Sequence, residues 1–60
     1  MDPATFGPFL KEARSRCELT QTQLAERLHV STAAVSKWER GKSLPDIAKV
    51  EALANALDLS

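Results

Sequence analysis

The sequence is poor in the residues that build disulfides and metal sites. Its 60 residues include one cysteine and one histidine. One cysteine cannot form an internal disulfide, and two soft ligands are too few for a zinc site. The sequence therefore predicts no metal and no cofactor, and it favours a protein of the reducing cytosol.

Long apolar runs are missing as well. No stretch approaches the roughly 20 apolar residues that cross a bilayer. The first residues, MDPATFG, have neither the basic end nor the apolar stretch of a signal peptide. We expect a soluble, unprocessed, cytoplasmic chain with no membrane partner.

Net charge is absent, because eight Lys and Arg balance eight Asp and Glu. The basic balance typical of a nucleic-acid-binding protein is therefore missing overall. The distribution is uneven, since residues 36–43 carry three positive charges against one negative, and residues 44–60 carry one against three.

Catalytic patterns are missing too. There is no paired carboxylate in an apolar setting, no Gly-rich phosphate loop and no Ser/His/Asp or Cys/His set. A chain this short buries only about 60% of its unfolded surface, so nearly every apolar residue is needed for one core. We expect a single domain over residues 1–60 that is not an enzyme and has no small-molecule substrate.

Apolar residues recur at i, i+3 and i+4, and no stretch alternates as a strand does, which predicts an all-α fold. The first helix is expected from near Thr5 to just before Leu19, with Pro8 in its first turn. Its apolar stripe contains Phe6, Leu10, Ala13 and Cys17.

Three further helices are expected. Thr20 caps a helix over residues 21–28, and Ser31 caps another over residues 32–40, which ends at Gly41. Pro45 opens the fourth. The apolar stripe of the fourth helix is Ile47, Val50, Leu53, Ala54 and Leu57.

The second and third helices are separated by only three residues, which forces a sharp angle between them. Such a pair needs a small residue at the crossing, an apolar plug in the turn, and two inward residues on the second helix. The sequence supplies these as Ala25, Val30, Val35 and Trp38. This bihelical arrangement, over about residues 21–40, is the one that places a helix in the DNA major groove.

The stretch LTQTQLAERLHVSTAAVSKWERGKSLPD, residues 19–46, resembles the Cro and phage-repressor type of helix-turn-helix, also called Xre-like. The resemblance extends over residues 6–60. It implies a compact, lambda-repressor-like domain of four to five helices, a bacterial or phage repressor that binds palindromic double-stranded DNA as a homodimer. The family usually has Gly, with positive φ, where this chain has Glu18, His29 and Asp58.

With Val35 and Trp38 turned inward, the other side of the third helix is left to meet base edges. Lys37 can donate to guanine, and small methyl groups can contact thymine. The predicted base-contacting residues are Thr32, Ala33, Ser36 and Lys37. The alternative is an ordinary solvated helix face.

Phosphate contacts are expected on both sides of that helix. By resemblance, Gln21 binds a phosphate and braces Thr32, and the N–H groups of its helix favour an anion. Arg40, Lys42 and Ser43 follow the third helix and fit contacts with the DNA backbone. The alternatives are an exposed polar residue and a solvated charge run.

The remaining distinctive residues are expected to have structural roles. The resemblance pairs Arg14 with Glu39 as a partly buried ion pair, and it places Trp38 in the core rather than against a base. Cys17 is expected to be a small buried hydrophobe rather than a redox sensor. For His29, a local role in the turn is favoured over a pH switch or a ligand.

Two functions remain open. Sequence-specific DNA binding in transcriptional regulation is favoured, and an antitoxin or anti-repressor module that binds chiefly a protein is the alternative. One bidentate contact discriminates by about 1 to 3 kcal/mol, while useful specificity needs about 4 to 10 kcal/mol. With Lys37 as the only long side chain available for bases, we expect a homodimer or a module joined to another domain. The exposed edge formed by Leu57 and Leu59 is the expected contact between copies.

Overall fold

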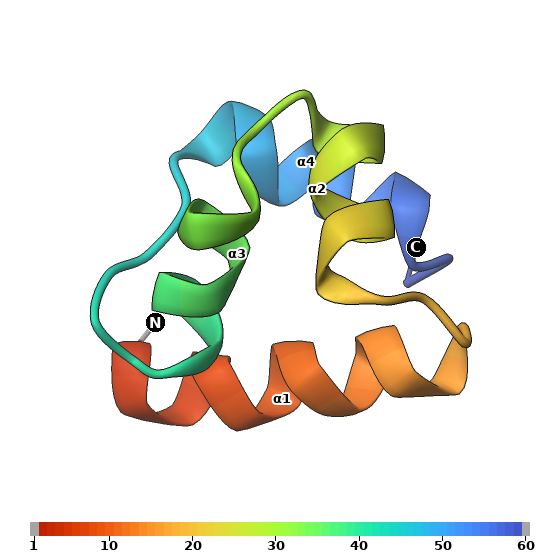
Figure 1. Ribbon diagram of the computed structural model, residues 1–60. Coiled ribbons are helices and arrows are strands. Elements are labelled where there is room, and N and C mark those ends of the chain that lie inside the picture. Colours follow the sequence, from red (N-terminus) through yellow and green to blue (C-terminus); the bar gives the residue numbers. More distant parts are fainter. Residues whose placement is uncertain (1, 60) are drawn as a thin grey trace.

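The computed structural model describes residues 2–59, which form four helices and no strand. These are α1 (Pro3–Arg16), α2 (Gln21–Leu28), α3 (Thr32–Glu39) and α4 (Ile47–Ala56). α1 lies along one side, α3 packs on α1, α2 packs on α3, and α4 packs on α2 (Figure 1). The predicted all-α, four-helix fold is confirmed. Between residues 2 and 59, no helix is long and apolar enough to cross a bilayer.

The start of α1 differs from the sequence prediction. The helix begins at Pro3, and the carboxylate of Asp2 caps it by accepting the Ala4 N–H at 3.2 Å. Thr5 already lies in the first turn, and its hydroxyl donates to Asp2 at 3.3 Å. Pro8 therefore lies in the second turn rather than the first. The reason is that a carboxylate at the cap and a proline directly after it form a complete start signal of their own.

α2 and α3 begin at the predicted caps. The Thr20 hydroxyl accepts the Gln23 N–H at 3.0 Å, and the Gln23 side-chain oxygen accepts the Thr20 N–H at 2.8 Å. This reciprocal pair is a capping box. The Ser31 hydroxyl accepts the Ala34 N–H at 3.1 Å. α3 ends at Glu39, one residue earlier than predicted.

α4 begins later than predicted. Asp46 is its cap and accepts the Lys49 N–H at 2.9 Å, so Pro45 lies outside the helix. The cap falls on Asp46 because its carboxylate can satisfy a free N–H group and Pro45 has no such acceptor. Ile47 is 79% exposed and does not belong to the core stripe. The rest of that stripe is buried or half-buried: Val50, Leu53, Ala54 and Leu57.

Each of the four helices within residues 2–59 is followed by a residue with positive φ. The angles are 56° at Glu18, 57° at His29, 74° at Gly41 and 56° at Asp58. In every case the next N–H donates to a carbonyl five residues back, over 2.9 to 3.2 Å (Leu19 to Arg14, Val30 to Ala25, Lys42 to Lys37, Leu59 to Ala54). This is the Schellman motif, and the positive φ implied by the resemblance is confirmed at its three non-glycine positions.

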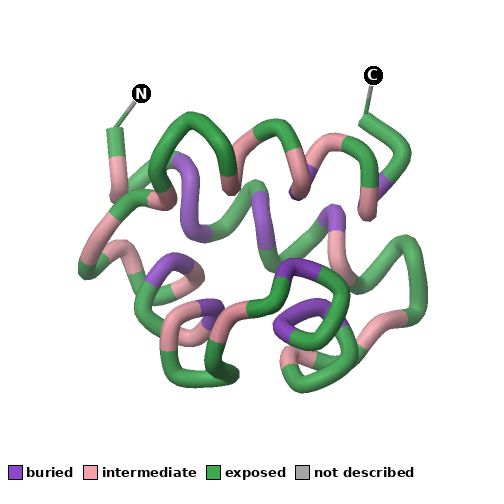
Figure 2. Tube along the Cα trace, turned by 90° about the horizontal axis from the view of Figure 1, so that it is seen from above, coloured by how far each residue is buried: buried purple, intermediate pink, exposed green. Residues whose placement is uncertain are grey.

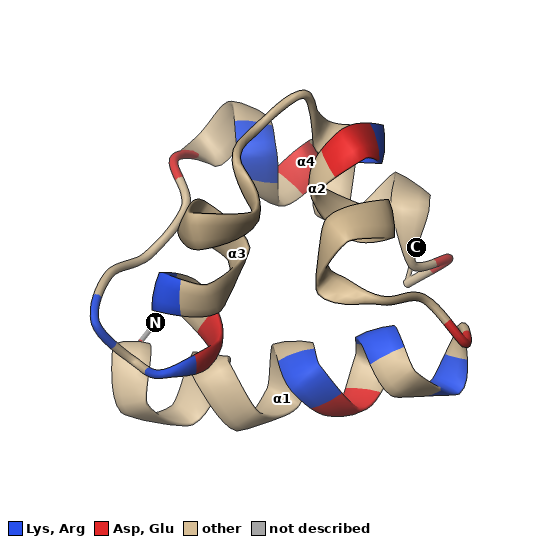
Figure 3. Ribbon diagram, in the orientation of Figure 1, with Lys and Arg blue, Asp and Glu red and all other residues tan. Residues whose placement is uncertain are grey.

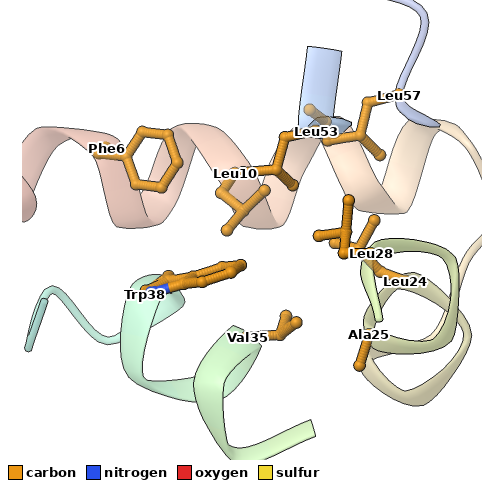
Figure 4. Packing of buried hydrophobic residues seen from close by; sticks show 10 residues of the cluster. Phe6, Leu10, Leu24, Ala25, Leu28, Val35, Trp38, Leu53 and Leu57 are labelled. Atoms are coloured by element: carbon orange, nitrogen blue, oxygen red, sulfur yellow. The ribbon is translucent and has the colours of Figure 1, made fainter. Parts of the chain in front are cut away.

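One apolar core joins all four helices. Trp38 and Val35 of α3 lie beneath Phe6 and Leu10 of α1 (Figure 4). The other buried members are Ala13, Leu24, Ala25, Leu28, Leu53 and Leu57. Along the chain, buried positions alternate with exposed ones at helical spacing (Figure 2). The predicted inward positions are confirmed, and Val30 packs against this core from the turn.

Cys17 is exposed, so its predicted place in the core is wrong. It follows the last residue of α1, where the chain already turns away, and its Sγ lies 3.5 Å from the Leu57 carbonyl oxygen at the rim. A free thiol at a rim has few neighbours to pack against, and helical periodicity cannot reveal where the core ends.

Gly7 sets the distance between α1 and α3. A Cβ at this position would lie 2.5 Å from the carbonyl oxygen of Glu39 and 2.9 Å from that of Trp38. Both atoms belong to the backbone, so no side-chain movement can make room. The absence of a side chain at Gly7 therefore lets the end of α3 rest directly on α1.

Candidate nucleic-acid interface

The α2–α3 unit owes its shape to a turn of three residues, His29 to Ser31. His29 takes the left-handed conformation, and the Val30 N–H donates to the Ala25 carbonyl at 3.0 Å. Val30 is half-buried against the core. Ala25 is buried, and its small side chain lets the two helices approach closely. The turn and the crossing together fix the direction in which α3 leaves the unit.

α3 has an inner and an outer side. Val35 and Trp38 are buried, whereas Thr32, Ala33 and Lys37 are exposed and Ser36 is half-buried. None of the four residues predicted to contact bases belongs to the core. The structure thus brings them onto the part of α3 that packing leaves unused.

Arg14 and Glu39 join α1 to the end of α3. The Arg14 Nε donates to the Glu39 Oε2 at 2.6 Å, and a second guanidinium nitrogen donates to Oε1 at 3.3 Å. The exposed fraction is 15% for the Arg14 side chain and 4% for that of Glu39. Arg14 also donates to the Leu19 carbonyl at 2.7 Å. The pair therefore holds α1, α3 and the turn before α2 in one arrangement.

Gln21 extends this network to α2. Its Nε2 donates to the Glu39 Oε1 at 3.0 Å, so the side chain is turned toward the end of α3. The expected brace between Gln21 and Thr32 is absent: the Thr32 hydroxyl donates instead to the Thr22 hydroxyl, 3.4 Å away. A carboxylate is a stronger acceptor than a hydroxyl, which explains why the amide prefers Glu39. An amide nitrogen has two protons, and one of them remains for another acceptor.

The segment after α3 carries the remaining predicted phosphate ligands. Arg40 is exposed and its Nε donates to the Ser36 carbonyl at 3.3 Å, Lys42 is exposed, and Ser43 is half-buried. Glu39, the acidic residue within residues 36–43, is turned inward onto Arg14. The outward charge of this segment is therefore positive. Figure 3 shows Lys and Arg on α3 and on the following loop, beside the start of α1.

Thr22 is a residue of this surface that the sequence patterns did not single out. It is the second residue of α2 and stands directly before Gln23 of the capping box. No sequence pattern assigns Thr22 a role of its own. Its contact with Thr32 depends on the crossing of the two helices, which no local pattern reports.

The opposite side of the molecule carries a small apolar cleft. Leu57 is buried, so the predicted exposed edge of Leu57 and Leu59 is wrong in this respect. On this side, Phe9 is 52% exposed and Leu59 is 45% exposed. They border a cleft of about 100 Å³ between α1 and α4. Among residues 2–59, no group of His, Cys, Asp and Glu is arranged to hold a metal ion.

Two short helices joined by a sharp turn, with the second helix free on its outer side, define the class of helix-turn-helix proteins. A family model described as helix-turn-helix matches residues 10–60. The chain belongs to this helix-turn-helix family, of the Cro and phage-repressor type.

Three characterised relatives fit this assignment. The HTH-type transcriptional activator BcrR of Enterococcus faecalis is 43% identical over 49 residues, which is 82% of this chain and 24% of the relative. The immunity repressor protein of Bacillus phage phi105 is 36% identical over 92% of this chain and 38% of its own. The HTH-type transcriptional regulator DicA of Escherichia coli K12 is 38% identical over 93% and 42%. The chain thus spans less than half the length of each relative.

Proposed function

We propose that this chain is the DNA-binding domain of a transcription regulator, which binds duplex DNA sequence-specifically with α3 in the major groove. The observation that carries the proposal is the division of α3. Val35 and Trp38 are its buried residues, with Ala34 partly packed against the same core, whereas Thr32, Ala33 and Lys37 are exposed and take no part in it. The names of the relatives, one activator, one repressor and one regulator, support the same function.

The base contacts follow from side-chain chemistry. The Lys37 ammonium can donate to the O6 and N7 acceptors of guanine. The methyl groups of Thr32 and Ala33 suit the thymine methyl, and Ser36 can bond either a base or a phosphate. Because three of these residues are short, the backbone of α3 must approach the bases closely.

The phosphate contacts flank α3. The second amide proton of Gln21 and the first N–H groups of α2, which lack intrahelical acceptors, form one cluster of donors. Arg40, Lys42 and Ser43 form the other. Only two of these groups, the side chains of Arg40 and Lys42, carry a charge, and so only they release counterions on binding.

Two copies are needed for useful specificity, as a homodimer or through a further domain, on a palindromic operator. One bidentate lysine contact gives about 1 to 3 kcal/mol of discrimination, well below the roughly 4 to 10 kcal/mol of a specific site. Half-sites of a symmetric pair are then about 34 Å apart.

Selection of bound duplexes from a random library tests the proposal. The expected result is a palindrome with a guanine in each half. For two copies with two cations each, the slope of log K against log salt is about −3.6, so affinity falls about 150-fold between 50 and 200 mM salt. If no duplex is bound even at low salt, the chain is better explained as an antitoxin or anti-repressor module that binds a protein.

Three variants separate the roles. In Lys37→Ala the guanine preference should relax, whereas in Lys42→Ala affinity should fall equally for all sequences and the salt slope should drop by about 0.9 per copy. Arg16→Ala is the matched control. It removes the same charge from an exposed side chain at the end of α1, outside both proposed groups of phosphate ligands, and it should leave both quantities unchanged.

A further inference from the structure

Thr22 and Thr32 connect the first turns of the two helices of the helix-turn-helix unit. Thr22 is the second residue of α2 and Thr32 is the first of α3. The Thr32 hydroxyl donates to the Thr22 hydroxyl over 3.4 Å, and both residues are exposed. Neither hydroxyl caps a helix, since Thr20 and Ser31 perform that task.

The contact restricts what Thr32 can offer to a ligand. The bond engages the Thr32 Oγ1 with the Thr22 Oγ1. The side chain is branched at Cβ, so fixing the position of Oγ1 also fixes the direction of the methyl group. Thr32 is left with its methyl group in a defined place.

We propose that Thr22 is a positioning residue for base recognition, which holds Thr32 in the rotamer that selects a thymine methyl group. This inference rests on the proposed function, because it requires the first turn of α3 to lie against bases. Thr22 itself touches no base in this scheme and acts only through Thr32.

A matched pair of substitutions isolates the contact. Thr22→Val keeps the shape and the branching of the side chain but removes the hydroxyl that bonds Thr32. Thr22→Ser keeps the hydroxyl and serves as the conservative rescue. Because Thr22 is exposed, both variants should keep the unfolding midpoint of the parent.

The measurement is the affinity for the selected operator in which each thymine is replaced, one at a time, by uracil. This exchange removes a single methyl group from the DNA. At the thymine that Thr32 contacts, the replacement should weaken binding of the parent and of Thr22→Ser about fourfold, the value of one buried methyl group. In Thr22→Val the same replacement should have almost no effect. Thr32→Ser, which lacks the methyl group on the protein side, should show the same insensitivity.

Three results would overturn the inference. The first is a fourfold uracil effect that survives in Thr22→Val, and the second is a parent protein that is insensitive to every uracil. The third is a uniform loss of affinity in Thr22→Val for all sequences, because this would make Thr22 a phosphate ligand. Failure of the parent to bind any duplex would remove the proposed function as well, so the two failures are distinguishable.

Discussion

Replacement of Arg14 by Met tests whether the buried carboxylate of Glu39 depends on its partner. Glu39 accepts two hydrogen bonds from Arg14, at 2.6 and 3.3 Å, and one from Gln21, at 3.0 Å. Arg14→Met removes the first two and leaves a carboxylate that is 4% exposed with one neutral donor. Breaking a buried pair in this way costs about 3 to 5 kcal/mol.

This cost is large for so small a domain. At about 0.05 to 0.15 kcal/mol per residue, the free energy of unfolding of the whole chain is roughly 3 to 9 kcal/mol. Arg14→Met should therefore remove a third or more of the stability. The double variant Arg14→Met with Glu39→Met buries two apolar chains of similar length instead of a pair of ions, and its stability should lie within about 1 kcal/mol of the parent.

Urea unfolding followed by the fluorescence of Trp38, the only tryptophan of the chain, measures these differences. Variants that are largely unfolded in water can be compared in a stabilising osmolyte. The reasoning fails if Arg14→Met costs less than about 1 kcal/mol, or if the double variant is as unstable as the sum of the two single variants.

Four further substitutions test the fold with the same unfolding assay. Gly7→Ala should lower the free energy of unfolding by about 1 to 3 kcal/mol, because the added Cβ meets backbone oxygens of α3. Helix propensity alone favours Ala, so a stabilised variant would contradict the close approach of α1 and α3. Glu18→Gly should raise the free energy of unfolding by about 1 kcal/mol, because Glu18 has a positive φ that glycine adopts without strain. Asp58→Gly should raise it by less, because Asp tolerates positive φ better than Glu. Equal gains in the two variants would argue against this account. Thr20→Ala should lose about 1 kcal/mol with the capping box, and an unchanged midpoint would show that the box contributes nothing.

Local rules explain what the sequence predicted correctly. The starts of α2 and α3 follow from Thr20 and Ser31, capping residues that stand directly before an apolar helical pattern. The inward positions Val35 and Trp38 follow from their spacing, since residues three apart share a helix face.

Competition between neighbouring signals explains the errors in the helix starts. Asp2 and Thr5 are both capping residues near the start of α1, and Pro45 stands directly before Asp46 at the start of α4. Periodicity also overestimated the core. It identifies the face of a helix, but not how far along the helix its neighbours extend, and so it predicts a core position for Cys17 and Ile47, which are both exposed.

The candidate site shows a different limit. Gln21 and Thr22 are adjacent in the sequence, and either could bond a residue of α3. The choice depends on Glu39, which lies 18 residues from Gln21 along the chain and attracts the amide only after α1, α2 and α3 have packed. Such three-way competition is invisible to any rule that considers one helix at a time.

The strict division of α3 has a consequence for how this surface can change. Turning the helix by one residue would carry Trp38 and Val35 into water, and each such side chain contributes at least about 1.5 to 3 kcal/mol by its burial. The rotational register of α3 is therefore locked by residues that take no part in contacts outside the molecule. Its exposed positions Thr32, Ala33 and Lys37 lie outside the core, so a library varied at these positions alone can alter the outer surface of α3 while the helix keeps its orientation.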